Sequence, residues 1–300
     1  MSFAAEPALG ATATARRPPP GRGVLGRLAR DPMGLAGLVL VCLVVGVALF
    51  APWLAPQDPT RIDVARKFQG PSLAHWAGTD QLGRDLLSRI IHGARTALSI
   101  ALGATGIAGA CGLILGLVAG YGPRWLDAGL VLVFDALSSL PMVMFAMAVI
   151  TVVGPGTGTL ILVIVLVSVP GYARLIRAQT LALKGADFVL AERCIGASGT
   201  RIVLCHLLPN VAGPLVILIS MDIPVVIMLE AGLSYLNLGV RPPTPSWGNI
   251  LYDGYTSLRF APSMIIAAGI PLILATLGFT FLGEGLRDAL DPRLGYGAPR

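Results

Sequence analysis

Three carboxylates stand inside apolar stretches of the sequence, where ionisable side chains are rare: Asp135, Asp222 and Glu230. If these stretches cross a membrane, each charge costs about 2.5–3.5 kcal/mol on insertion scales, so it should face a cavity or a partner. With Ser138 and Ser139 they are candidates for the polar lining of a solute path. No Lys or Arg is expected to pair with them in the core. Alternatively, the serines bond back to helix carbonyls and Glu230 snorkels or caps its helix.

Chemistry of other kinds finds little support in the sequence. A P-loop requires a Gly-rich turn followed by Lys and then Ser or Thr. The chain has two lysines, Lys67 and Lys184, and they precede Phe68 and Gly185. The three histidines are far apart: His75, His92 and His206. We therefore expect no enzyme site, no metal site and no cofactor bound by this chain.

The composition places the chain in a membrane. Only 13% of its 300 residues are charged, against about 25% in soluble domains, and 55% are hydrophobic. This excludes disorder, ordinary soluble enzymes and, despite the net charge of +6, a nucleic-acid surface. Five arginines precede the first apolar run, as expected of a cytoplasmic leader beside anionic lipid: Arg16, Arg17, Arg22, Arg27 and Arg30.

Six apolar stretches have about the 20 residues needed to cross hydrocarbon. They are 33–51, 96–120, 128–152, 159–180, 209–235 and 262–284. The first is longer than a secretory signal core of about 7–15 residues, so we expect it to be retained. The prediction is an all-α polytopic protein with six transmembrane helices and both termini cytoplasmic. Its segments are a leader (1–30), a first helix (31–55), a periplasmic loop with an amphipathic segment (56–95), a core (96–285) and a cytoplasmic tail (286–300).

Charge only partly supports this topology, because the expected outer loop 56–95 is rich in basic residues. It also contains four aspartates, which indicates that it is folded rather than a bare hairpin. Within the spans, Gly112, Gly116 and Gly120 form a GxxxGxxxG row, which favours close helix packing. Five prolines inside the spans predict bent helices, either around a moving path or as stable kinks in a static bundle: Pro141, Pro170, Pro214, Pro224 and Pro271.

The segment 184–208, between the fourth and fifth spans, is the most informative stretch. Four residues share one face of a predicted short helix, at i, i+3, i+4 and i+7: Phe188, Ala191, Glu192 and Ile195. Gly196 follows as a C-cap, and a second helix begins before Leu208-Pro209. A helix–Gly–helix element can dock in a groove of another protein. By periodicity alone, a solvated connector is equally consistent.

This segment resembles the EAA loop of ABC-importer permeases. The family pattern ends in Gly-Ala-Ser and then Leu-Pro-Asn, matched here by Gly196, Ala197, Ser198, Leu208, Pro209 and Asn210. Leu190-Ala191-Glu192 stands where Glu-Ala-Ala is usual, so the acid is shifted.

Further motifs, in consistent order from 31 to 294, resemble the C-type permease subunit of the peptide/nickel importers. They begin at Asp31, His75, Pro170, Pro242 and Leu286. The resemblance implies the type I importer permease fold in a bacterial inner membrane. It also implies a homologous second permease in a heterodimer, an external substrate-binding protein, and two cytoplasmic ATPases that hold ATP and Mg²⁺. Phe188, Ala191, Glu192, Gly196, Ala197, Ser198 and Pro209 would then form the coupling element to an ATPase.

The substrate class expected from this resemblance is short peptides, since the scattered histidines do not favour nickel ligation. Nickel chelates, opines and oligosaccharides are the alternatives for this type of importer. A secondary carrier without an ATPase is a different hypothesis, motivated by the acids at membrane depth. A scaffold that transports nothing fits poorly with several proline-bent helices.

Overall fold

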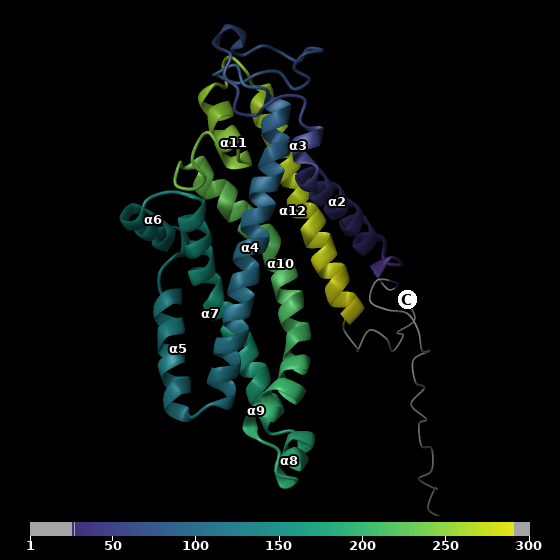
Figure 1. Cartoon of the computed structure of the whole chain (residues 1–300), viewed down its shortest axis with the longest axis vertical. Coiled ribbons are helices and arrows are strands. Elements are labelled where there is room, and N and C mark those ends of the chain that lie inside the picture. The colour runs from purple at the N-terminus through teal and green to yellow at the C-terminus, as the bar shows by residue number, and fades with distance from the viewer. Residues whose placement is uncertain (1–25, 27, 291–300) are drawn as a thin grey trace, which may run out of the picture.

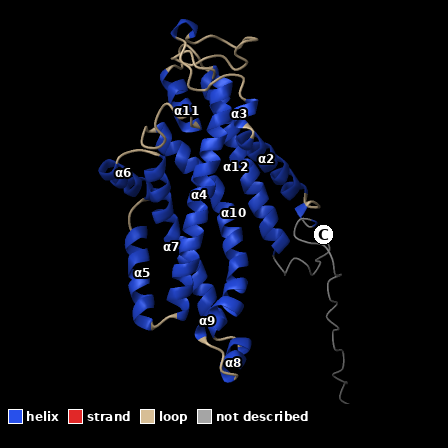
Figure 2. Cartoon of the chain, viewed as in Figure 1, coloured by secondary structure: helices blue, strands red, loops and turns tan. Residues whose placement is uncertain are grey.

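The computed structural model describes residue 26 and residues 28–290, so almost all of the expected leader and residues 291–300 of the expected tail lie outside the described part. Within that part the chain is helical and no strand is formed (Figure 2). Five helices are long and apolar enough to cross a membrane, and a sixth crossing is reached if one bent pair counts as a single span. The all-α polytopic architecture is thereby confirmed.

Helices α2 (Pro32–Leu49) and α12 (Ser263–Leu290) run side by side at one edge of the bundle (Figure 1). The Asp31 carboxylate caps α2 by accepting from the Gly34 amide at 2.8 Å. Small residues bring the two helices together, since a Cβ on Gly37 would lie 2.4 Å from the Leu282 nitrogen. A short α3 (Ala51–Leu54) follows α2.

Helix α4 (Leu86–Tyr121) lies in the centre of the molecule and begins ten residues before the expected span at 96. The Asp85 carboxylate caps it by accepting from the Ser88 amide at 2.8 Å. The charged Arg89 lies in the first turns of α4 and lowers the local hydropathy, so hydropathy alone does not reveal where the helix begins. In the structure Arg89 is only 3% exposed and is ion-paired. Residues 86–95, expected in the outer loop, are therefore helical.

The glycine row of α4 faces α7 (Thr157–Lys184) and lets the two backbones approach closely. A Cβ on Gly112 would lie 2.5 Å from that of Tyr172, and one on Gly116 would lie 2.6 Å from that of Ile176. Gly120 meets Thr180 in the same way. The packing interpretation of this row is confirmed.

Substitution of Gly116 by leucine is expected to separate α4 from α7, because overpacking of a filled contact costs about 1–3 kcal/mol. We expect a lower melting temperature in detergent, measured by tryptophan fluorescence. Gly106 is the matched control, since nothing lies within 4 Å of a Cβ at that position of the same helix. Equal melting temperatures for the two leucine variants would contradict the packing role.

The expected span 128–152 is not one straight helix. It consists of α5 (Arg124–Ser138) and α6 (Met142–Val153), which meet at 89°. Pro141 stands at the break because it has no amide proton and disfavours helical geometry at the residue before it. The prolines of α7, α10 and α12 lie inside continuous helices.

Short elements connect α7 to the next long helix: α8 (Asp187–Cys194), α9 (Gly199–Arg201) and the π-helix η2 (Ile202–Leu207). Helix α10 (Leu208–Tyr235) then leads back through the bundle to α11 (Trp247–Thr256). Figure 1 places α8 at one end of the molecule and α11 near the other.

At the α11 end lies a folded loop, residues 55–85, which we call the cap; its regular part is the 3-10 helix η1 (Val64–Arg66). Asp80 is fully buried and pairs with Arg84 at 2.6 Å and with Arg89 of α4. Both guanidinium groups also contact Asp253 of α11, at 3.4 and 3.2 Å. Two of the basic residues that disturbed the charge pattern are thus neutralised inside this cluster.

Candidate functional site

Helix α8 ends as its sequence predicts. Gly196 has φ +83, a backbone conformation that favours glycine. Its amide donates to the Arg193 carbonyl and the Ala197 amide donates to the Glu192 carbonyl, each at 3.0 Å. This pair of bonds is the Schellman motif, so the predicted C-cap is confirmed. The Ser198 hydroxyl then caps α9 by accepting from the Arg201 amide.

Helix α8 presents apolar side chains at the end of the molecule. Val189 is buried and holds the helix against the bundle. Three large apolar side chains remain 41–79% exposed: Phe188, Leu190 and Ile195. Ala191 and Pro209 are exposed as well, whereas Glu192 is half-buried. An apolar helix face outside the bundle has the composition of a docking surface.

Tyr121, the last residue of α4, contacts the segments on both sides of α8. The Lys184 ammonium lies 5.3 Å from its ring centroid and the Arg193 guanidinium 5.9 Å, both within cation–π range. Lys184 also donates to the Tyr121 carbonyl at 3.0 Å. A Cβ on Gly199 would lie 3.2 Å from the ring, so α9 packs directly on it. Tyr121 therefore ties the α8 region to α4.

Glu192, the shifted acid of the loop, makes a second contact, toward α10. Glu192 of α8 lies 3.3 Å from the Nε2 atom of His206, in the π-helix that runs into α10. The Phe188 ring packs 6.4 Å from the same imidazole. Helix α8 and its flanks thus contact α4 through Tyr121 and, through His206, the π-helix that runs into α10.

The polar residues predicted for the path do not form one cluster. On α5, the side chain of Asp135 is 67% exposed and lies 3.6 Å from Arg174 of α7. Arg174 also donates to the Ser138 hydroxyl at 2.5 Å. The expectation that no basic residue pairs with these acids is therefore wrong for Asp135. Ser139 donates to the Ala136 carbonyl, as the alternative interpretation stated.

The two acids of α10 lie apart from this group and from each other. Asp222 is half-buried beside the Tyr172 phenol of α7. Glu230 is fully buried and accepts from the Ser234 hydroxyl at 2.8 Å, so snorkelling to solvent is excluded. Their roles in a path stay predictions.

Sequence reasoning missed Tyr121, His206 and Arg174 as contact-making residues. Arg174 contacts the Phe134 carbonyl 40 residues away and Tyr121 contacts Lys184 63 residues away, whereas His206 meets Glu192 within the segment between α7 and α10. The one local signal was the shifted position of Glu192, for which the sequence alone indicates no partner. The structure provides His206 as that partner.

A helical bundle that crosses the membrane, with polar pairs between its helices and an exposed apolar helix face at one end, is the architecture of a multi-pass transport component. Residues 112–296 match the family described as the inner membrane component of binding-protein-dependent transport systems. Residues 20–71 match the N-terminal transmembrane domain of oligopeptide transport permease C. The chain belongs to this family of inner-membrane transport permeases.

Two relatives align over most of their length. The dipeptide transport system permease protein DppC of Alkalihalophilus pseudofirmus is 34% identical over 277 residues, which cover 92% of this chain and 90% of the relative. The glutathione transport system permease protein GsiD of Escherichia coli is 39% identical over 269 residues, 89% of each chain.

The fold also resembles that of an inward-facing MetNI methionine ABC transporter chain. The TM-score is 0.56 at 16% identity, over 68% of this chain and 97% of that chain. This likeness shows the fold of a type I importer permease, as the sequence motifs predicted.

Proposed function

We propose that this chain is the membrane-spanning subunit of an ATP-driven importer for short peptides, delivered by an external binding protein. The observation that supports this most directly is the apolar face of α8 outside the bundle, tied to α4 by Tyr121 and to α10 by His206. In this proposal α8 docks on one of two cytoplasmic ATPases, which hold the ATP and Mg²⁺. ATPase closure then moves α4 and α10, and the helices alternate between two orientations around the path.

The proposed orientation places α8 in the cytoplasm and the cap outside. Counting α5 and α6 as one crossing, six crossings return the end of α12 to the side on which α2 begins. Both termini are then cytoplasmic, and the basic loop residues Lys184, Arg193 and Arg201 lie inside, in agreement with the positive-inside rule.

A second, homologous permease is proposed to complete the path. Asp135 and Arg174 are 67% and 45% exposed on this chain, although both lie in membrane-spanning segments. A charged pair at that depth does not face lipid without a large penalty. A wet path between two chains, lined here by Asp135 and Ser138, removes that penalty.

Short peptides are the proposed substrates because the two relatives are named as permeases for dipeptide and for glutathione. The test is uptake of labelled di- and tripeptides by cells that lack this chain, with restoration from a plasmid. We expect uptake to fall to background and to return with the plasmid. Unchanged uptake of every peptide tested, or ATP-independent flux in liposomes containing this chain alone, would contradict the proposal.

Replacement of Tyr121 by alanine is expected to reduce the peptide transported per ATP hydrolysed. Two exposed cation–π contacts are worth about 1–2 kcal/mol together, or about 5- to 30-fold in the population of the tied loop. The assay is coupled uptake and ATP hydrolysis in proteoliposomes containing the complete transporter.

Phenylalanine at the same position is the matched control, because it keeps the ring that Lys184 and Arg193 face. We expect coupling in Tyr121→Phe to remain within about twofold of the unsubstituted protein. Equal losses in the two variants would show that the hydroxyl, not the ring, matters and would contradict the proposed tie.

A further inference from the structure

Asp135 and Arg174 form an exposed pair of opposite charges about halfway along the membrane-spanning helices. Arg174 lies ten residues before Lys184, the last residue of α7, and Asp135 lies eleven residues after Arg124, the first residue of α5. At 1.5 Å per residue, both lie about 15 Å from the helix ends on the α8 side, or half of a hydrocarbon core. Packing within this chain does not account for a carboxylate that is 67% exposed at this depth.

The Arg174 guanidinium is held in place by the end of α5. Its Nη2 atom donates to the Phe134 carbonyl at 3.0 Å and to the Ser138 hydroxyl at 2.5 Å. Both acceptors lie near the C-terminal end of α5, just before the break at Pro141, and the dipole of a helix favours a cation at this end. The guanidinium is therefore positioned before any solute arrives.

Most of the hydrogen-bonding capacity of the pair is free. The Nη2 atom of Arg174 lies 3.6 Å from the Asp135 carboxylate, which is beyond hydrogen-bond range. Within the part of the chain that the structure describes, Asp135 accepts no hydrogen bond and the Nε and Nη1 atoms of Arg174 donate none. A carboxylate open to an ammonium group thus lies beside a guanidinium open to a carboxylate.

The apolar side chains around the pair suit a solute whose ends are constant and whose side chains vary. Five large apolar residues near the break between α5 and α6 are 45–73% exposed: Leu132, Leu140, Val143, Met144 and Met147. Methionine is flexible and polarizable, so it adapts to partners of different shape. All unmodified linear peptides share a terminal ammonium and a terminal carboxylate, which a fixed acid–base pair can bind whatever the side chains are.

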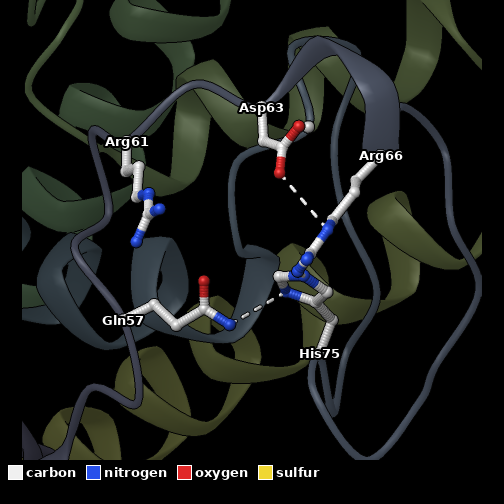
Figure 3. A pocket seen from close by; sticks show the side chains of 6 residues that line it. Gln57, Arg61, Asp63, Arg66 and His75 are labelled. Carbon is white, nitrogen blue, oxygen red and sulfur yellow. Dashed lines mark hydrogen bonds and ion pairs between the residues drawn. The ribbon is translucent and has the colours of Figure 1, made fainter.

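The cap contains a comparable ion pair in a different environment. Figure 3 shows Asp63 and Arg66 paired at 3.2 Å beside a hollow of about 240 Å³, and their side chains are 39% and 50% exposed. In the proposed orientation the cap lies in water, where an exposed ion pair costs little and needs no ligand. Asp135 and Arg174 lie at membrane depth instead, so their exposure indicates a polar partner from outside this chain.

We infer that this pair selects the transported peptide by its charged ends. The Asp135 carboxylate binds the terminal ammonium, and the Arg174 guanidinium binds the terminal carboxylate. The long contact between the two side chains is then replaced by shorter, charge-assisted hydrogen bonds to the peptide. This inference rests on the proposed function, which supplies the peptide and the wet path. It narrows the substrate class to zwitterionic peptides with both ends free.

The test measures binding of labelled dialanine to the complete transporter in nanodiscs, with N-acetyl-dialanine and dialanine amide as competitors. Each competitor lacks one of the two charged ends. The external binding protein is left out, so that its own selectivity does not enter the measurement. For the unsubstituted transporter we expect each blocked form to compete about tenfold more weakly than dialanine, because one charge-assisted contact is lost.

Asp135→Asn should remove the preference for a free ammonium, so that acetylation changes affinity by less than about twofold, and keep the preference for a free carboxylate. Arg174→Gln should show the reverse. The matched control is Asp127→Asn, the same change on the same helix, because Asp127 is already bound by Arg177 of α7 at 2.5 and 2.8 Å. Both preferences should persist in this control, even if its overall affinity falls.

Three results would overturn the inference. The unsubstituted transporter could bind all three ligands equally or show no saturable binding, or both preferences could persist in Asp135→Asn and Arg174→Gln. All three variants, Asp127→Asn included, could instead lose both preferences alike, which would indicate only altered packing of α5 on α7. Peptide uptake by the unsubstituted transporter with its binding protein, measured in parallel, separates these results from failure of the proposed function, since uptake then proceeds normally.

Discussion

Replacement of Gly196 by valine is expected to lower peptide uptake about 5- to 30-fold while the ATPases remain bound. Gly196 has φ +83, and its conformation closes the turn that follows α8. A β-branched residue disfavours this conformation by about 1–2 kcal/mol, which corresponds to that loss in the population of the docking geometry. ATP hydrolysis should persist, because the nucleotide sites lie on partner subunits in the proposed function. The measurement is peptide transported per ATP hydrolysed in proteoliposomes.

Two matched variants separate backbone conformation from side-chain size. Gly196→Asn should retain most of the coupling, since asparagine tolerates positive φ. Gly185→Val places the same side chain in open space of the same loop, at φ −94, and should also transport well. Nothing lies within 4 Å of a Cβ at position 196 either, so a steric clash does not explain a loss there. Normal uptake by Gly196→Val, with normal expression, would count against the coupling role of this turn.

Replacement of Asp80 by asparagine is expected to unfold the cap. The carboxylate is fully buried and is shared by Arg84 and Arg89, which are themselves 6% and 3% exposed. Removal of one partner from a buried ion pair costs about 3–5 kcal/mol, because the remaining charges stay buried without compensation. Asp253 alone cannot replace Asp80, since its contacts with the two guanidinium groups are longer, at 3.2 and 3.4 Å. Limited proteolysis of the cap is the measurement.

Asp63→Asn is the control for this prediction, because it makes the same chemical change within the same cap. Asp63 and Arg66 are 39% and 50% exposed, and an exposed ion pair is worth less than about 1 kcal/mol. We expect its proteolysis rate to match that of the unsubstituted protein. Equal resistance of the Asp80 and Asp63 variants would show that the buried cluster does not hold the cap.

Local patterns predicted several features correctly. The i, i+3, i+4, i+7 spacing before Gly196 predicted α8 and its cap, because a short helix and its terminating turn depend on residues within about one turn. The GxxxGxxxG row predicted a close helix contact, although not that its partner is α7. The start of α4 was missed because hydropathy counts Arg89 as exposed, whereas its charge is paired inside the cluster around Asp80.

The sequence by itself determined the class of protein, the approximate spans and the helix–Gly–helix form of the segment 184–208. These follow from apolar length, from glycine and proline at particular positions, and from motifs in a consistent order. Only the tertiary structure decided which charges meet. Arg84 and Arg89 join Asp80 to Asp253, which lies 164 residues beyond Arg89, and Arg174 joins α7 to Asp135 of α5. Such pairs depend on how helices pack in space. The periodicity of one helix shows which of its residues share a face, but not which residue of another helix lies against that face.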